Sequence, residues 1–243
     1  MALRGIKLVT FDATNTLLKF RVPPWEYYAM VAKDYGFKGN GKDIKPKMLN
    51  SYRVMIEQQP NFGCDTISWE LWWRRVIEMT FQDQLLNDSN IAKISAKLID
   101  DYKTERCWKK ANGADDLIGA LKESGITIGV ISNFDPRLHD ILHNLKITNW
   151  FDFVLTSYEV GICKPDKRIF GIAKARSKLQ INTSECLHIG DDFKKDYEGA
   201  KLAGWHALLL IDKGHDSSLK TPNTYCSLKQ INDAIANNDL QVL

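Results

Sequence analysis

Polar residues with useful chemistry follow four apolar runs of this chain, which cover residues 6–11, 126–132, 151–157 and 186–190. They are Asp12, Thr14 and Thr16 after the first run, Ser132 and Asn133 at the end of the second, Lys164 a few residues past the third, and Asp191, Asp192 and Asp196 after the fourth. Each set alone has an ordinary explanation, since Ser-Asn is common in turns and Gly-Asp-Asp can begin a helix. Their shared place at the ends of apolar runs indicates one site.

The chemistry that these residue types support best is phosphoryl transfer. Clustered carboxylates repel one another unless a cation lies between them, and their hard oxygen ligands suit Mg²⁺. A phosphate brings more negative charge, which a metal ion, a lysine and hydroxyl or amide donors can offset. An aspartate in such a site can attack phosphorus and form an aspartyl-phosphate. We therefore expect Mg²⁺ as cofactor and a small phosphorylated metabolite as substrate.

The elements that would position these residues form an α/β fold. The four runs and a fifth one at residues 206–211 are short, apolar and rich in β-branched residues, and from about residue 113 they alternate with helix-like segments. Continuously apolar strands that alternate with helices predict a Rossmann-like parallel sheet covered on both faces. Ligands of such sheets bind beyond the carboxyl ends of the strands, which is where the polar sets lie.

A second region separates the first predicted strand from the second. Its roughly ninety residues are far more than an ordinary connection needs, and four of its segments have the pattern of amphipathic helices. We predict a helical domain at residues 20–106, inserted in a core domain made of residues 1–19 and 107–243. Its many aromatic residues indicate the core of a small helical bundle, with the lining of a substrate cleft as the alternative.

Composition excludes several classes of protein. The net charge of +3 comes without a basic block, so the sequence gives no indication of nucleic-acid binding. Five scattered cysteines with no Cys-x-x-Cys pair predict reduced thiols and no zinc site. No apolar run approaches the ~20 residues of a membrane span, and the first residues lack the pattern of a signal peptide. We expect a soluble cytoplasmic protein that does not bind membranes.

The four polar sets resemble the four motifs of the haloacid dehalogenase superfamily. "FDATNT" is similar to its D-x-D-x-T motif, "VISNFD" to the second, "KPD" to the third and "GDDFKKD" to the fourth. The stretches "QPNFG", "WELWW" and "KPDKRIF" further resemble the subgroup of haloacid dehalogenase-like hydrolase domain-containing protein 3, which includes rhythmically expressed gene 2 proteins. The resemblance implies a sheet with the first strand central, and a C1-type helical cap that closes over the strand ends.

The resemblance also implies a metal site. Asp12 would be both the nucleophile and a Mg²⁺ ligand, and the backbone carbonyl of Thr14 would be another ligand. Asp191 would complete the site. Asp196 would hold the catalytic lysine or a metal-bound water, and Asp192 would lie outside the first shell of ligands or in solvent.

Three more residues would bind the phosphoryl group. The Ser132 hydroxyl would bond a phosphoryl oxygen with help from the adjacent Asn133, and Lys164 would neutralise both the nucleophile and the phosphate. By contrast, we predict that His188, inside the fourth apolar run, is a core histidine with satisfied hydrogen bonds.

Thr14 departs from the family pattern. Phosphatases of the superfamily have an aspartate there, which protonates the leaving oxygen, and such help is worth about 10²–10⁴ in rate. Three interpretations follow: a slow Mg²⁺-dependent phosphatase or phosphotransferase, a non-catalytic phosphate-binding or metabolite-binding protein, and a metal-independent dehalogenase-like hydrolase. The Gly190–Asp191 pair disfavours the third, because dehalogenases of the superfamily have serine-type residues at this place.

Overall fold

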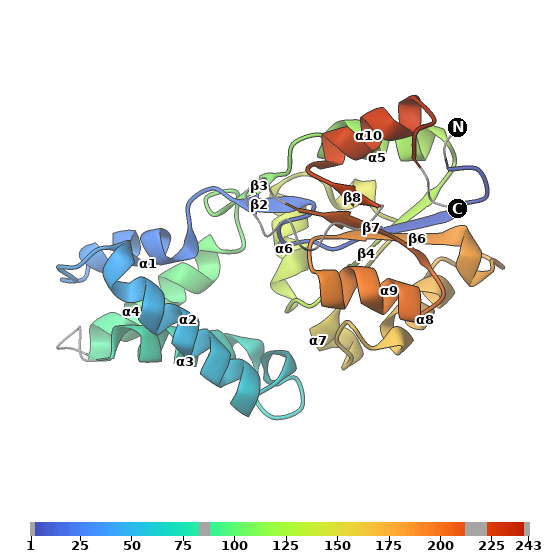
Figure 1. Ribbon diagram of the computed structural model, residues 1–243. Helices are drawn as coiled ribbons and strands as arrows, with labels where there is room; N and C mark the ends of the chain where they lie inside the picture. Colours follow the sequence, from blue (N-terminus) through green and yellow to red (C-terminus); the bar gives the residue numbers. More distant parts are fainter. Residues whose placement is uncertain (1–2, 83–87, 212–222, 241–243) are drawn as a thin grey trace. The chain divides into compact units, whose positions relative to one another are not determined.

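The computed structural model describes residues 3–82, 88–211 and 223–240 and divides the chain into two compact units (Figure 1). The first, called the core unit here, consists of Met1–Lys19, Lys110–Asn133 and Lys146–Leu243. The second, the helical unit, consists of Phe20–Lys109 and Phe134–Leu145. Among the described residues, no helix is long and apolar enough to cross a membrane.

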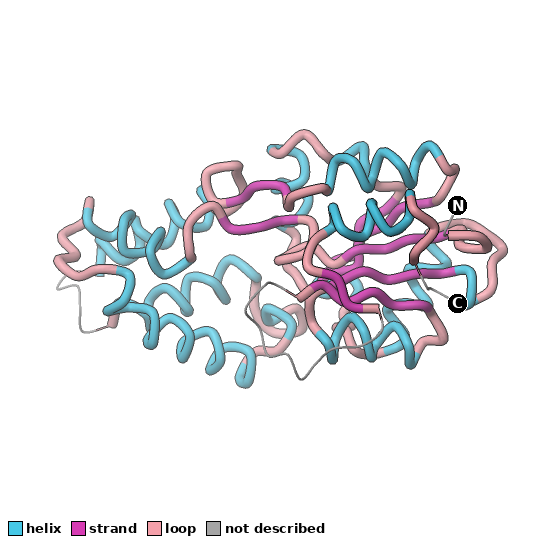
Figure 2. The backbone as a smooth tube through the Cα atoms, turned by 45° about the horizontal axis from the view of Figure 1, so that its top comes forward, coloured by secondary structure: helices cyan, strands magenta, loops and turns pink. Residues whose placement is uncertain are grey.

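The core unit is built on a six-stranded sheet in the order β5-β4-β1-β6-β7-β8, in which every neighbouring pair is parallel. Figure 2 shows these strands side by side, with helices on either side of the sheet. The strands are β1 (Leu8–Phe11), β4 (Thr127–Ser132), β5 (Phe153–Thr156), β6 (Cys186–Gly190), β7 (His206–Leu210) and β8 (Thr224–Tyr225). This confirms the predicted α/β class and the central place of the first strand. The two-residue strand β8 was not predicted.

Helices cover both faces of the sheet, which explains why the central strands β1 and β6 are fully buried and largely apolar. Helices α5 and α10 pack together on one face, and α8 and α9 lie together on the other (Figure 1). The helices and short turns of the core unit are α5 (Ala114–Glu123), η2 (Thr148–Trp150), α7 (Ser157–Val160), α8 (Lys167–Arg176), η3 (Thr183–Glu185), the π-helix η4 (Phe193–Glu198), α9 (Gly199–Leu202) and α10 (Leu228–Ala236).

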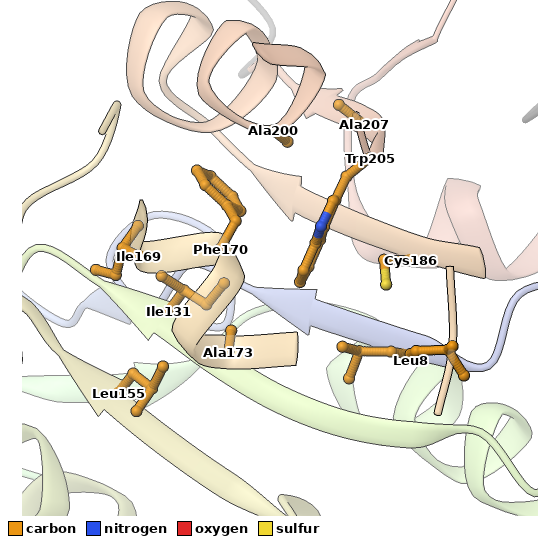
Figure 3. Packing of buried hydrophobic residues seen from close by; sticks show 11 residues of the cluster. Leu8, Ile131, Leu155, Ile169, Phe170, Ala173, Cys186, Ala200, Trp205 and Ala207 are labelled. Atoms are coloured by element: carbon orange, nitrogen blue, oxygen red, sulfur yellow. The ribbon is translucent and has the colours of Figure 1, made fainter. Parts of the chain in front are cut away.

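One apolar cluster joins the sheet to the helices of the second face. Phe170 of α8 and Trp205, which precedes β7, pack with their rings 5.5 Å apart, and strand residues such as Leu8 and Ile131 belong to the same cluster (Figure 3). Complete burial of side chains of this size stabilises the fold by roughly 1.5–3 kcal/mol each. The cluster thus holds β1, β4 and β6 together below their carboxyl ends.

The helical unit is a bundle with an aromatic interior. Trp72 is fully buried against Met55 and Val76, and its indole N–H donates to the carbonyl of Gln59 over 2.8 Å. This supports the bundle-core interpretation for that tryptophan. The helices and turn of the unit are α1 (Pro24–Lys33), α2 (Gly41–Gln58), η1 (Asn61–Gly63), α3 (Trp69–Phe81), α4 (Asp88–Asp101) and α6 (Arg137–Asn144).

The boundaries between the units differ from the predicted division in two places. The helical unit continues to Lys109, past the predicted end at residue 106. Strands β2 (Leu18–Phe20) and β3 (Trp108–Lys110) pair in a two-stranded sheet at this boundary. The segment Phe134–Leu145, assigned to the core from sequence, groups with the helical unit. The reason is a set of polar contacts within this unit, in which the buried Asp135 carboxylate accepts from the Trp73 indole N–H over 2.7 Å and pairs with Arg137.

Candidate active site

The order of the sheet places three of the predicted residues at one edge. Strands β4 and β6 flank β1, with Phe11 in register with Val130 on one side and Ile189 on the other. Asp12 directly follows β1 and Ser132 ends β4. Asp191 follows β6 in the same way. These residues therefore come together because their strands are parallel neighbours.

Lys164 lies at the centre of the site. Its ammonium group donates to the Asp12 carboxylate over 2.8 Å, to the Asp196 carboxylate over 2.6 Å and to the backbone carbonyl of Ile131 over 2.7 Å. An ammonium has three protons, so these three acceptors satisfy it. The side chain is only 1% exposed, so the charges interact at low local dielectric.

Two residues at the end of β4 support this lysine and its partner. The Ser132 hydroxyl hydrogen-bonds to Asp12. The Asn133 amide clasps the backbone of Lys164: its Oδ1 accepts from the backbone N–H over 2.8 Å and its Nδ2 donates to the carbonyl over 2.9 Å. The predicted help of Asn133 in phosphate binding stays a prediction, while its contacts in the structure fix Lys164.

Asp196 lies in η4 and is buried beneath the lysine. Its Oδ1 also contacts Nε2 of His188 at 3.2 Å, and its Oδ2 accepts from the backbone N–H of Asp192 over 3.0 Å. Gly190 allows this close approach, since a Cβ atom there would lie 2.2 Å from Asp196 Cγ. Burial opposes ionisation of Asp196, but Lys164 and the His188 bond hold its pKa below the usual value.

Three carboxylates form an acidic group at the strand ends. Asp12, Asp191 and Asp196 each have an oxygen within 4.8 Å of the other two. Burial, reinforced by the charges of Asp12 and Asp196, raises the pKa of Asp191 to about 7, against a hydrogen bond from Asn15. Burial likewise raises the pKa of Asp12, and Lys164 opposes that rise. One lysine does not balance this group, which therefore favours an additional cation.

Thr14 and Asp192 lie beside the acidic group and contact the local backbone. Thr14 is half-buried and makes an isolated bridge to Leu18, in the turn after β1. The Asp192 carboxylate caps the first turn of η4 by accepting from the backbone N–H groups of Lys194 and Lys195 over 3.1 and 2.9 Å. That contact gives Asp192 a part in the local fold, and its predicted place outside the metal ligands stays a prediction.

Two contributors to the site, Asn15 and the backbone carbonyl of Ile131, were not predicted from the sequence. Asn15 hydrogen-bonds to Asp191 and has a positive φ of 60°, a conformation that asparagine tolerates better than most residues. Its position between two threonines in the first motif was the available signal. The carbonyl of Ile131 gives no signal in sequence, because every residue has a backbone oxygen.

The chain is similar to known proteins over most of its length. Residues 6–204 match the model of the family described as haloacid dehalogenase-like hydrolase. The chain is 38% identical to Rhythmically expressed gene 2 protein of Drosophila melanogaster over 224 residues, which cover 88% of this chain and 86% of the relative. It is 32% identical to haloacid dehalogenase-like hydrolase domain-containing protein 3 of Bos taurus, over 84% of this chain and 82% of the relative.

Solved structures with the same fold include two kinds of enzyme. A 2-haloacid dehalogenase from Pseudomonas syringae superposes with a TM-score of 0.65 at 22% identity, over 96% of this chain and 99% of that one. A HAD phosphatase from Thermococcus onnurineus superposes with a TM-score of 0.66 at 17% identity, over 95% and 98%. At these identities the likeness shows the fold alone. The family model and the relatives together show that this chain belongs to the haloacid dehalogenase-like hydrolases.

Proposed function

We propose that this protein is a Mg²⁺-dependent hydrolase of a small phosphorylated metabolite, which reacts through an aspartyl-phosphate on Asp12. The observation that carries the proposal is the buried Lys164 ammonium, which bridges Asp12 and Asp196 at 2.8 and 2.6 Å beside a third carboxylate, Asp191. The arrangement joins a nucleophile, a fixed positive charge and unbalanced acidic ligands at one sheet edge.

The donor set fits Mg²⁺. The ligands we assign are the carboxylates of Asp12 and Asp191 and the backbone carbonyl of Thr14, all of them hard oxygen atoms. Burial raises the pKa of both carboxylates, so a bound cation would favour the ionised form that binds it, which supports this assignment. When bound, the ion supplies charge that offsets the phosphoryl oxygens. Asp196 is left out of this set, because Lys164, His188 and Asp192 already occupy its oxygens.

In the proposed reaction an oxygen of Asp12 attacks phosphorus and the leaving group departs, after which water releases phosphate and restores the carboxylate. Lys164 favours the ionised form of Asp12 against the effect of burial and orients the carboxylate, and the Ser132 hydroxyl would donate to a phosphoryl oxygen. The contact of Lys164 with Asp12 supports the first role. The hydrogen bond of Ser132 to Asp12 places its hydroxyl beside the proposed nucleophile, where its single proton would turn to the phosphoryl oxygen when substrate binds.

Thr14 determines which substrates react well. A threonine hydroxyl is too weak an acid and too weak a base for general acid–base catalysis at neutral pH, so help of about 10²–10⁴ is lost at this position. We infer that esters with basic leaving groups turn over slowly, and that phosphorylated compounds with acidic leaving groups turn over faster.

The compartment we propose is the cytoplasm. All five cysteines are free thiols in the structure, two of them buried, which supports a reducing environment.

Two other functions stay open as outcomes of the test. A non-catalytic phosphate-binding protein would keep the same metal site, and Thr14 favours it. A dehalogenase-like hydrolase also needs no acid at this position, but its reaction needs no metal, whereas Asp191 adds a carboxylate with uncompensated charge.

The test is an assay with Mg²⁺ over a broad panel of phosphorylated metabolites, with 2-haloacids as a separate arm without metal. We expect low activity that Asp12→Asn abolishes, and faster hydrolysis of unactivated esters by Thr14→Asp. If no ester is turned over and Asp12 is never phosphorylated, the binding-protein interpretation replaces ours. Halide release without metal would support the dehalogenase instead.

A further inference from the structure

A buried histidine lies directly behind the proposed site and has no part in the reaction described above. His188 is in the middle of β6 and is fully buried. Its Nδ1 is 2.8 Å from the hydroxyl of Thr10 on β1, and its Nε2 is 3.2 Å from Oδ1 of Asp196. The same Oδ1 accepts from Lys164 over 2.6 Å. These contacts make a continuous series of hydrogen bonds from Thr10, in the middle of the sheet, through His188, Asp196 and Lys164 to Asp12.

The chemistry of the partners sets the direction of this series of hydrogen bonds. An ionised carboxylate only accepts hydrogen bonds, so the bond to Asp196 requires the proton on Nε2 of His188. Burial lowers the pKa of His188, which keeps the ring neutral. Its Nδ1 then has no proton and accepts from the Thr10 hydroxyl. Every donor and acceptor in the series is thereby satisfied.

We propose that His188 is a positioning residue, which holds the Asp196 carboxylate in the orientation that places Lys164 against Asp12. Two donors held in place by the fold bind the Asp196 carboxylate: the His188 ring N–H donates to Oδ1 and the backbone N–H of Asp192 donates to Oδ2. Together they set the plane of the carboxylate. The inference rests on the proposed function, since it gives a task to a residue that supports the proposed nucleophile.

A purely structural role for His188 makes a different prediction. The ring also packs edge-on against Phe170, with centroids 5.3 Å apart. If packing were its only task, an apolar side chain of similar volume would serve as well. If positioning is the task, a side chain that keeps the N–H donor should serve better than an apolar one.

Three variants separate these roles: His188→Gln, which offers an amide N–H; His188→Leu, which offers none; and Thr10→Val, which removes the support of the ring while keeping its shape. We expect kcat of His188→Leu to fall about 10–100-fold, because small misplacement of a reacting group costs rates of this order. KM should change less than about twofold, since Asp196 is not proposed to bind substrate. His188→Gln should recover most of the loss, and Thr10→Val should lie between.

Crystal structures of the wild type and the variants give a readout that does not depend on activity. In His188→Leu we expect the Asp196–Lys164 contact to lengthen beyond hydrogen-bonding distance, about 3.5 Å, and in His188→Gln to persist. If His188→Leu does not fold, the Gln and Val variants carry both measurements.

The proposal is overturned if His188→Leu keeps kcat within twofold of the wild type, if the Leu and Gln variants lose activity equally, or if the Asp196–Lys164 contact survives in all three variants. If the wild type never phosphorylates Asp12, the proposed function fails by itself. The lengths of the Asp196–Lys164 contact then still decide whether His188 positions this pair.

Discussion

Replacing Lys164 by methionine should strongly destabilise the protein, because it leaves two carboxylates buried without their partner. The Asp196 and Asp12 side chains are 2% and 11% exposed, and both receive the Lys164 ammonium. Breaking a buried ion pair by removal of one partner costs about 3–5 kcal/mol. For a chain of this length, that corresponds to a melting temperature about 6–20 °C lower.

The loss of stability in Lys164→Met should depend on pH, because the two carboxylates left without a partner titrate. Without Lys164 the pKa values of Asp12 and Asp196 in the folded protein rise above those of the unfolded chain. Such groups oppose folding when ionised and do so less as pH falls and they take up protons. The difference in free energy of unfolding between the wild type and Lys164→Met should therefore be largest near pH 8 and become smaller toward pH 5.

The assay is unfolding by heat and by urea, without Mg²⁺, at both pH values. The matched control is Lys195→Met, which removes a lysine that pairs with Asp192 at a similar distance, 2.7 Å, but is 50% exposed. An exposed pair of this kind contributes at most about 1 kcal/mol. Equal losses in the two variants, or a difference from the wild type that does not become smaller at pH 5, would refute the buried network as described.

Three other predictions concern the acidic group and its turn. Mg²⁺ should raise the melting temperature more at pH 8 than at pH 5.5, because Asp191, with a pKa of about 7, must lose its proton to bind metal. Without metal, the stability of the protein should depend on pH in the opposite direction, because the contribution of Asp191 is full below its ordinary pKa and is lost as pH rises through 7. Asp191→Asn should therefore raise the melting temperature of the metal-free protein at pH 8 and remove its increase with Mg²⁺. Thr14→Asp should flatten the dependence of rate on leaving-group pKa in a series of aryl phosphates and speed the most basic leaving groups by about 10²–10⁴; an unchanged slope would count against the account of Thr14. Gly190→Ala should displace Asp196, whose Cγ lies 2.2 Å from the new Cβ, and should lower both the melting temperature and kcat. In contrast, Gly171→Ala, inside helix α8 and with nothing within 4 Å of its Cβ, should leave kcat nearly unchanged and should raise the melting temperature slightly.

The meeting of Asp12, Ser132 and Asp191 at one edge could be predicted, because continuously apolar strands imply a parallel sheet and their carboxyl ends share an edge. The grouping of Phe134–Leu145 with the helical unit could not, since it depends on the contact between Asp135 and Trp73, which are distant in sequence. Strands of two or three residues, such as β8, are too short to show a period.

The orientation of side chains within the site could not be predicted from the sequence either. Asn133 stands next to Ser132 in sequence, yet its amide faces the backbone of Lys164. His188 was predicted to be a satisfied core histidine, and its two hydrogen bonds confirm that. Its link to Asp196 depends on the path of the π-helix η4, which no local pattern in the sequence predicts.

The most direct test of the central claim is a single turnover in H₂¹⁸O with Mg²⁺ and an activated phosphoryl donor such as acetyl phosphate, followed by acid quench and mass spectrometry. We predict a transient phosphoryl group on the peptide that contains Asp12, absent in Asp12→Asn, with ¹⁸O from water recovered in the released phosphate. No phosphorylated peptide, or phosphate released equally fast by Asp12→Asn, would contradict the claim that Asp12 is the nucleophile of a phosphoryl transfer.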